Sequence, residues 1–241
     1  MAEVKSTAAY VGAALALQCA ACSQQAATPA RSEARAEQAA AQPAPRADQK
    51  LVLAFGDSLY AGYRLRADEG FAPALERELA AAGIKAKVVN GGVSGDTTAG
   101  GRARLAFTLD GLERKPDLAI VGLGANDMLR GLDPGQTRAN LDAILAELER
   151  RQIPIVLTGM LAPRNYDQPY IRAFEAIYPD LAKRYGAPLD PFILEGVITD
   201  PRLLLADRVH PNAAGVQVMA RRVAPIVARR LGESGGATDA R

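Results

Sequence analysis

The amino-acid sequence predicts an α/β fold of three layers, in which helices cover both faces of a mostly parallel, about five-stranded sheet. Segments typical of strands alternate with segments typical of helices five times from residue 51 onward. The chain has 241 residues, of which 49% are hydrophobic, and this is enough for one sizeable core. We therefore expect a single folded domain at residues 51–231.

Five apolar segments have the length and composition of strands in the interior of such a sheet. In chain order they are residues 51–55, 86–89, 118–123, 155–158 and 187–190. The first consists of five apolar residues that lead directly into Gly56, and the second ends in a glycine-rich turn. The third follows Pro116 and ends at Gly124. The fourth starts after Pro154, a position where a missing N–H is tolerated.

Helical patterns separate these strands. In chain order they are residues 71–82, about 98–109, about 134–151, about 170–185 and a segment that begins after Asn212. Phe71, Leu75 and Leu79 recur every four residues in the first helix, which Gly83 ends as a C-cap. Pro225 should kink or shorten the last helix.

The segments outside this domain have other compositions. Residues 1–22 resemble a signal peptide, with an early Lys5 and a short apolar stretch of small residues. Cys22 follows two alanines, which resembles the lipobox of bacterial lipoproteins, where the cysteine is acylated. We therefore expect an exported, periplasmic protein that is anchored to a membrane through Cys22. Plain secretion, with cleavage among the alanines, is the alternative.

Composition excludes several other classes of protein. Residues 23–50 are rich in Ala, Gln and Pro without apolar periodicity, which is typical of a flexible linker, and residues 232–241 are expected to form a disordered tail. The net charge of +2 argues against a nucleic-acid partner. No apolar run reaches the length of about 20 residues that a permanent membrane span needs. Residues 51–231 contain no cysteine, which excludes a cysteine nucleophile there.

Polar groups follow three of the predicted strands. Ser58 follows the first strand, Gly95 lies in the turn after the second, and Asn126 lies in the turn after the third. The carboxyl ends of parallel strands share one edge of a sheet, where open α/β sheets bind their ligands. His210, the only histidine of the chain, precedes Pro211, which disfavours a helical conformation at His210. A serine hydroxyl, hydrogen-bond donors and a base on a loop are therefore expected at one edge.

Four short blocks contain these residues: Gly56-Asp57-Ser58-Leu59, the Gly95 turn, Gly124-Ala125-Asn126-Asp127 and Asp207-Arg208-Val209-His210. In this order they resemble the four sequence blocks of the SGNH (GDSL) hydrolases, and most closely those of bacterial thioesterase I/lysophospholipase L1 and related arylesterases. The resemblance covers roughly residues 50–230 and implies a flavodoxin-like arrangement of the sheet. A Gly-x-Ser-x-Gly motif is absent, so the serine does not resemble the nucleophile elbow of the α/β-hydrolases.

The resemblance also implies a role for each residue. Ser58 is the implied nucleophile, His210 its general base and acid, and Asp207 the residue that orients the imidazole. The backbone N–H groups of Ser58 and Gly95 and the side-chain amide of Asn126 form the implied oxyanion hole. Neither a metal nor an organic cofactor is implied.

We therefore expect a secreted serine esterase that acts on small-molecule or lipid carboxylic esters, with thioesters and lysophospholipids as further substrates. Their positions in the sequence predict that Tyr60, Met128 and Tyr166 line an acyl groove. The oligomeric state is not predicted. Two alternatives stay open: a carbohydrate O-acetylesterase of the same fold, and a catalytically silent envelope protein that binds a ligand.

Overall fold

Five parallel strands form one sheet, in the order β2-β1-β3-β4-β5. They are β1 (Lys50–Gly56), β2 (Ala86–Gly92), β3 (Leu118–Gly122), β4 (Ile155–Thr158) and β5 (Leu189–Asp190). The structure is a computed structural model that describes residues 48–236, with side chains up to residue 233. It confirms the predicted α/β fold with a parallel sheet. The strand order is the flavodoxin-like one, which binds ligands at its switch point beside the first strand.

The predicted N-terminal segments lie outside the described residues. The signal peptide expected at 1–22, the acylation site expected at Cys22 and residues 23–47 of the expected linker fall there, as do residues 237–241 of the expected tail. The described residues belong to a unit that runs from Pro43 to Arg241. Within residues 48–236, no helix is both long enough and apolar enough to cross a membrane.

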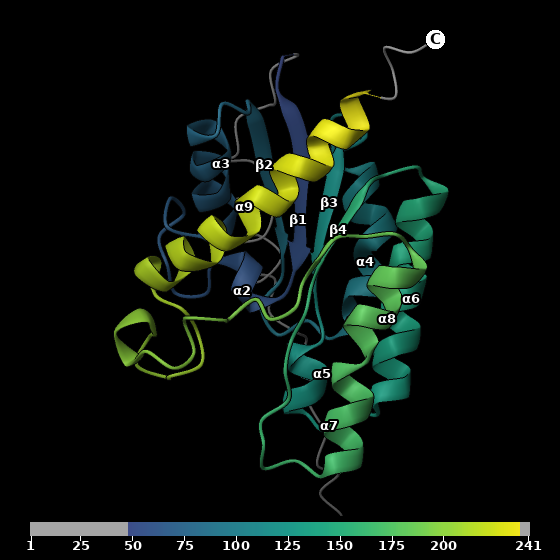
Figure 1. Cartoon of the computed structure of the whole chain (residues 1–241), viewed down its shortest axis with the longest axis vertical. Coiled ribbons are helices and arrows are strands. Elements are labelled where there is room, and N and C mark those ends of the chain that lie inside the picture. Colours follow the sequence, from purple (N-terminus) through teal and green to yellow (C-terminus); the bar gives the residue numbers. More distant parts are fainter. Residues whose placement is uncertain (1–47, 237–241) are drawn as a thin grey trace, which may run out of the picture. The chain divides into compact units, whose positions relative to one another are not determined.

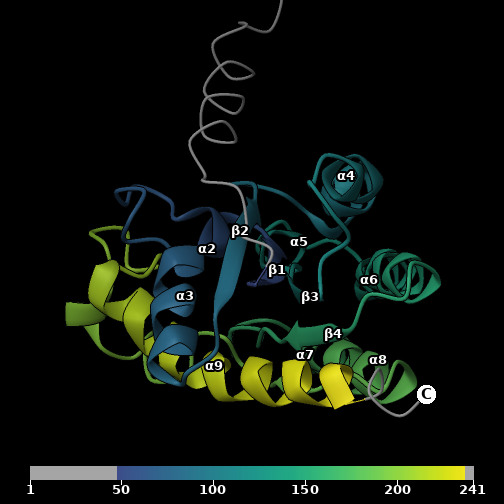
Figure 2. The ribbon, with the colours of Figure 1, turned by 90° about the horizontal axis from the view of Figure 1, so that it is seen from above.

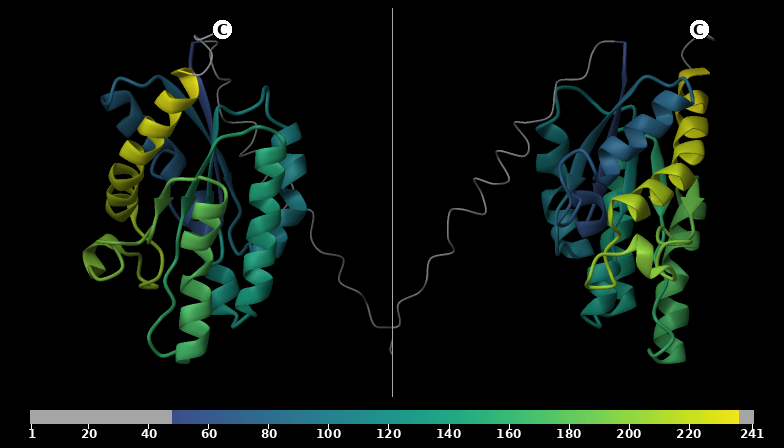
Figure 3. Two further views of the ribbon diagram at one scale, coloured as in Figure 1. Left: turned by 45° about the vertical axis from the view of Figure 1, so that its right-hand side comes forward. Right: turned by 90° about the vertical axis from the view of Figure 1, so that its left-hand side faces the viewer.

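Helices cover both faces of the sheet (Figures 1 and 2). They are α2 (Ser58–Ala61), α3 (Phe71–Ala81), α4 (Thr98–Asp110), α5 (Ala125–Leu129), α6 (Pro134–Arg150), α7 (Gln168–Glu175), α8 (Ile177–Arg184), α9 (Ala213–Gly236) and the 3-10 helix η1 (Pro201–Leu203). α3 packs along α9 on one face, whereas α4 and α8 pack against α6 on the other. The short helices α2 and α5 follow β1 and β3 directly, so they lie at the carboxyl edge of the sheet. Figures 1 and 3 show the segment that leads into α9 at the same end of the molecule.

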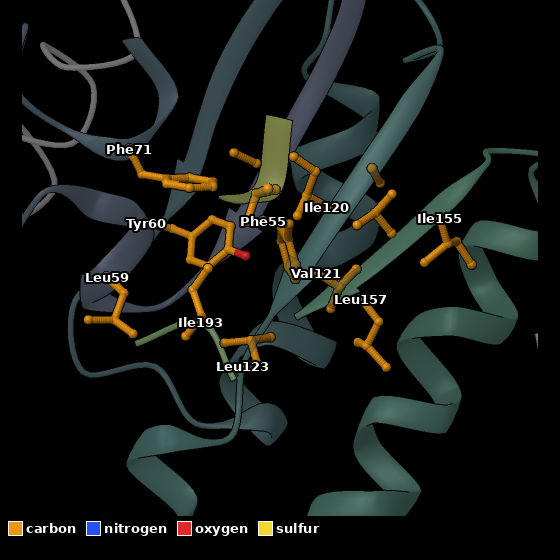
Figure 4. Packing of buried hydrophobic residues seen from close by; sticks show 14 of the residues in the cluster. Phe55, Leu59, Tyr60, Phe71, Ile120, Val121, Leu123, Ile155, Leu157 and Ile193 are labelled. Atoms are coloured by element: carbon orange, nitrogen blue, oxygen red, sulfur yellow. The ribbon is translucent and has the colours of Figure 1, made fainter. Parts of the chain in front are cut away.

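β1 is buried on both faces, as its apolar sequence predicts. Residues 51–55 are at most 1% exposed. Phe55 packs with Tyr60, Phe71 and Ile120 in the apolar cluster that Figure 4 shows. The ring centres of Tyr60 and Phe71 are 4.8 Å apart. The strand that leads into Ser58 is therefore held by side chains on both sides.

β2 is longer than the sequence predicts, because the glycine-rich turn begins as strand. It runs to Gly92 and pairs residue by residue with β1 as far as Gly56. A side chain at Gly92 would collide with the backbone of α2, since its Cβ would lie 2.3 Å from the Ala61 nitrogen. Glycine at this position thus lets the end of β2 contact the helix that carries Ser58.

Two helices differ from their predicted extents. The helix expected at about 170–185 is interrupted at Ala176, three residues before Pro179, whose missing N–H and bulky ring disfavour an unbroken helix there. α9 contains Pro225 and nevertheless continues to Gly236, past residue 232 where we expected the tail to begin. Buried residues on both sides of Pro225, Val223 and Val227 among them, keep α9 packed on the core.

Candidate active site

Ser58 lies directly after β1, where the chain turns into α2. Asp57 is the N-cap residue of α2, and its Oδ1 accepts a hydrogen bond of 3.0 Å from the Leu59 N–H. The Asp57 carbonyl accepts a second bond, of 2.9 Å, from the Ala61 N–H. Asp57 therefore caps the helix, which leaves the hydroxyl of Ser58 available to other partners.

Three side chains form a chain of hydrogen bonds that starts at Ser58. Ser58 Oγ lies 2.9 Å from His210 Nε2, and His210 Nδ1 lies 2.9 Å from Asp207 Oδ2. Ser58 and His210 are 152 positions apart in the sequence. The fold thus brings together the three residues that the sequence predicts as nucleophile, base and orienting acid.

The loop that carries His210 is closed by its own hydrogen bonds. The Leu205 N–H donates to the His210 carbonyl at 2.8 Å, and Leu204 forms an isolated bridge with Pro211. Asp207 Oδ1 accepts from the backbone N–H groups of Val209 and His210, both at 3.0 Å. Asp207 therefore holds both the backbone and the ring of His210.

These contacts explain the charge state of Asp207. The backbone N–H of His210 is the main cause that lowers the pKa of Asp207 to about 2, and the Val209 N–H and the imidazole contribute. A carboxylate that stays ionised can hold Nδ1–H of the imidazole and stabilise an imidazolium. The ring of Tyr63 covers His210, with ring centres 4.4 Å apart.

Asn126 lies against the turn that carries Gly95. Its Nδ2 donates a hydrogen bond of 2.9 Å to the Asp96 carbonyl, and an amide NH₂ group has a second N–H to offer. Gly95 has a φ of 83°, in the left-handed region that glycine adopts easily, and its carbonyl accepts from Arg130 Nη2 at 2.8 Å. The structure therefore places Asn126 against the residue that follows Gly95, although Asn126 and Gly95 are far apart in the sequence.

Asp127, the residue after Asn126, connects α5 to α4 through its carboxylate. Its Oδ2 accepts from the Thr98 N–H at 2.8 Å, and its Oδ1 accepts from the Thr98 hydroxyl at 2.5 Å. Asp127 is only 2% exposed. It ties α5, which carries Asn126, to the first turn of α4.

Asp57 is a second buried carboxyl beside the site. Burial raises its pKa to about 7, against the opposing effect of the Leu59 N–H, and the charges of Asp96 and Asp127 raise it further.

Within the described residues, no three side chains of His, Cys, Asp or Glu gather in a way that could hold a metal ion.

The predicted acyl groove needs correction. Tyr60 is 1% exposed and points into the core, where its hydroxyl lies 2.8 Å from Thr158 Oγ1, so it does not line an open groove. Met128 is also buried, at 5% exposed. Tyr166 is half-buried, and its hydroxyl donates to the Met128 carbonyl at 2.8 Å. Of these three residues, only Tyr166 is not buried.

Sequence reasoning missed the residues that support the site rather than form it. Tyr63, Arg104 and Arg130 contact His210, Asp96 and Gly95 respectively. Tyr63 lies in the stretch that resembles the SGNH hydrolases, and this was the only available signal for it. The two arginines have no pattern that separates them from the other arginines of the chain.

The chain is similar to known proteins in sequence. Residues 54–218 match the GDSL-like Lipase/Acylhydrolase family. The chain is 37% identical over 188 residues to an arylesterase of Vibrio mimicus, covering 78% of this chain and 92% of that protein. It is 40% identical over 185 residues to the thioesterase 1/protease 1/lysophospholipase L1 of Escherichia coli (strain K12), covering 75% of this chain and 86% of that protein.

Solved structures agree with the sequence comparisons. AlinE4, an SGNH-hydrolase family esterase, superposes with a TM-score of 0.66 at 50% sequence identity, covering 76% of this chain and 97% of that one. The crystal structure of TesA superposes with a TM-score of 0.70 at 36% identity, covering 75% and 99%. The chain therefore belongs to the GDSL (SGNH) lipase/acylhydrolase family, and it is an enzyme of that ester-hydrolysing class.

Proposed function

We propose that this enzyme hydrolyses carboxylic esters and thioesters by covalent catalysis at Ser58. The observation that carries the proposal is the hydrogen-bond chain from Ser58 through His210 to Asp207, with 2.9 Å at each step. Nucleophile, base and orienting acid within this reach are the arrangement that activates a serine hydroxyl near neutral pH.

The acylation step follows from this geometry. Ser58 Oγ attacks the acyl carbonyl while its proton passes to His210 Nε2, and the carbonyl oxygen becomes an oxyanion. Asp207 stabilises the imidazolium through Nδ1–H. The tetrahedral intermediate then expels the alcohol or thiol, which takes the proton from His210. An acyl group stays on Ser58.

Deacylation repeats the sequence with water. His210 takes a proton from water while the water oxygen attacks the acyl-serine. Collapse of the second intermediate breaks the bond between Ser58 Oγ and the acyl carbon, releases the carboxylic acid and returns the proton from His210 to Ser58. The N–H groups of Ser58 and Gly95 and the free N–H of Asn126 Nδ2 are the proposed donors to the oxyanion in both steps. Loss of one such donor typically costs about 3–4 kcal/mol of transition-state stabilisation.

The choice of substrates rests on the relatives. The Vibrio mimicus relative is named an arylesterase, and the Escherichia coli relative is named thioesterase 1/protease 1/lysophospholipase L1; we take aryl esters, thioesters and lysophospholipids as test substrates from these names. A panel of aryl esters of increasing acyl length, acyl-CoA, lysophosphatidylcholine and acetylated xylan tests the proposal. We expect the highest kcat/KM on acyl esters or thioesters; a clear preference for acetylated sugar would instead indicate an O-acetylesterase.

Removal of the nucleophile tests the chemistry itself. Ser58→Ala should lower kcat on the order of 10⁴–10⁶-fold. Ser94→Ala, which changes the only other serine of residues 51–231, is the matched control and should keep most of the activity. Full activity of the Ser58 variant would show that the enzyme uses another nucleophile, whereas a wild-type chain without activity would be the catalytically silent binding protein.

We also propose that the enzyme is exported and held at a membrane by acylation of Cys22, from the sequence of residues 1–22 alone. In a bacterial host, the full chain should incorporate labelled palmitate and sediment with membranes. The Cys22→Ser variant should incorporate none. Soluble, unlabelled and cleaved wild-type protein would support plain secretion.

A further inference from the structure

One guanidinium group joins the two turns on which the proposed chemistry depends. Arg104, on α4, donates from Nε to Asp96 Oδ2 at 2.5 Å and from Nη2 to the Gly56 carbonyl at 2.9 Å. Gly56 ends β1, two residues before Ser58, and Asp96 directly follows Gly95. Arg104 therefore bridges the strand end that carries the nucleophile and the turn that carries a proposed oxyanion donor.

The surroundings of Arg104 hold the guanidinium in place. Its central carbon lies 4.0 Å from the centre of the buried Phe55 ring. The side chains of Arg104 and Asp96 are only 11% and 17% exposed, so their ion pair is little screened by water. α4 can approach the sheet here because Gly101 has no side chain, and a Cβ there would lie 2.4 Å from Leu123 Cδ1.

Asp96 is held at both of its polar ends. Its carboxylate binds Arg104, and its carbonyl accepts from Asn126 Nδ2 at 2.9 Å. A movement of Asp96 would therefore displace the neighbouring Gly95 and change the partner of Asn126 together. Backbone pairing adds one more tie, because the Val93 N–H donates to the same Gly56 carbonyl at 3.0 Å.

We propose that Arg104 is a positioning residue that sets the distance between Ser58 and the oxyanion donors Gly95 and Asn126. The inference rests on the proposed serine-esterase mechanism. Oxyanion donors act only if they already stand where the charge develops, and a displacement of about 1 Å can cost on the order of 10²-fold in rate. Arg104 itself does not touch the substrate in this role.

The shape of arginine is essential to the proposal. The two hydrogen bonds leave from different nitrogens of one planar fork and reach acceptors on two separate segments. Lysine keeps the charge but has a single nitrogen and a flexible stem, so it cannot hold both acceptors in the same geometry. Arg104→Lys therefore separates the positioning role from a general need for positive charge.

The test compares Arg104→Lys and Arg104→Gln with Arg102→Gln on the same helix. Arg102 is exposed and bonds Asn140 Oδ1 at 3.3 Å, away from both turns. Steady-state rates on an aryl ester are divided by the number of sites that a fluorophosphonate titrates, so that unfolded protein does not count. We expect kcat per site to fall about 10–100-fold in both Arg104 variants with KM changed less than about threefold, and no change in Arg102→Gln.

A transition-state analogue provides a second measurement. The affinity for an alkyl boronic acid, which forms a tetrahedral adduct on serine, should fall in the same proportion as kcat, while the acid limb of the pH–rate profile stays where it is. A wild-type kcat per site in Arg104→Lys, or a loss confined to KM or to the number of titratable sites, would overturn the proposal. If wild-type turnover itself did not depend on Ser58, the esterase mechanism would fail instead.

Discussion

The side chain of Asp207 has two structural roles, one for each of its carboxylate oxygens. One of its oxygens fixes the backbone of the loop and the other holds the imidazole of His210. The sequence predicts Ser58, His210 and Asp207 as partners because each stands in a recognisable block. It could not predict that Tyr60 turns away from them. The face of a one-turn helix depends on the space that Gly56 and the distant Gly122 leave for the tyrosine ring.

Asp207→Asn should lower kcat on the order of 10³–10⁴-fold, because an amide favours the wrong imidazole tautomer and cannot stabilise the imidazolium. Asp200→Asn is the matched control, since Asp200 pairs with Arg202 earlier in the same segment. Steady-state kinetics of both variants at pH 7.5 measure the effect. Equal losses in the two variants would show that the loop, and not the contact with His210, is affected.

The low pKa of Asp207 predicts how this residue affects the pH dependence of the rate. Its pKa of about 2 keeps the carboxylate charged at every pH above about 3, so it adds no ionisation to the acid limb between pH 4 and pH 9. A profile of kcat/KM between pH 4 and pH 9 should therefore show no loss of activity that arises from protonation of the Asp207 carboxylate. Protonation of the Asp207 carboxylate above pH 4, followed by NMR of the labelled carboxyl carbon, would contradict this charge state.

Asp57 should make the fold less stable as the pH rises. Its pKa is about 7 when folded and about 3.9 in an unfolded chain, so the folded state binds the extra proton between these values. The stabilisation is complete below pH 4 and is lost as the pH approaches 7. The unfolding free energy of Asp57→Asn relative to wild type should therefore increase by about 2–3 kcal/mol when the pH rises from 5 to 8. Urea unfolding of both proteins at each pH measures this difference. An unchanged difference between the two proteins would show that Asp57 is charged when folded.

At the scale of elements, glycines decide where strands and helices touch. β2 was predicted too short because glycine-rich sequences are typical of turns, whereas here Gly91 and Gly92 continue the pairing with β1. The break between α7 and α8 follows from Pro179. The apolar periodicity over residues 170–185 fits one continuous helix and therefore does not predict this break. The continuation of α9 past Pro225 depends on packing that no local pattern shows.

Gly92→Ala should disturb both stability and catalysis. The added Cβ would lie 2.3 Å from the Ala61 nitrogen, so α2, which begins with Ser58, must move. We expect a loss of unfolding free energy of more than about 1 kcal/mol and a lower kcat. Gly232→Ala is the control, because nothing lies within 4 Å of that position and alanine favours a helix; it should raise stability slightly. Thermal unfolding of both variants measures the effect. Equal melting temperatures of Gly92→Ala and Gly232→Ala would contradict the expected collision with the backbone of α2.

At the scale of the whole molecule, the order of elements determines where the site lies. Strand and helix alternation predicts the parallel sheet and the edge that holds Ser58, Gly95 and Asn126, because the chain repeats the same right-handed unit. The contacts that join these turns, through Asp127 and Arg104, link segments more than 25 positions apart. Such contacts arise only once the layers are packed, which is why the sequence did not predict them.

Residues before Pro43 should be dispensable for catalysis. The core and all three members of the hydrogen-bond chain lie in the unit that starts there. A protein that begins at Pro43 should therefore have the kcat/KM of the full chain on a soluble aryl ester, within about twofold. A large loss of activity would show that the N-terminal residues contribute to the site.

The central claim, that Ser58 is the nucleophile, is tested most directly by covalent labelling. A fluorophosphonate probe should modify one residue of the wild-type enzyme, and peptide mass spectrometry should locate the adduct on Ser58. The labelling rate should fall at least about 10²-fold in His210→Ala, because the hydroxyl then lacks its base. An adduct on another residue, or inactivation that leaves Ser58 unmodified, would contradict the claim.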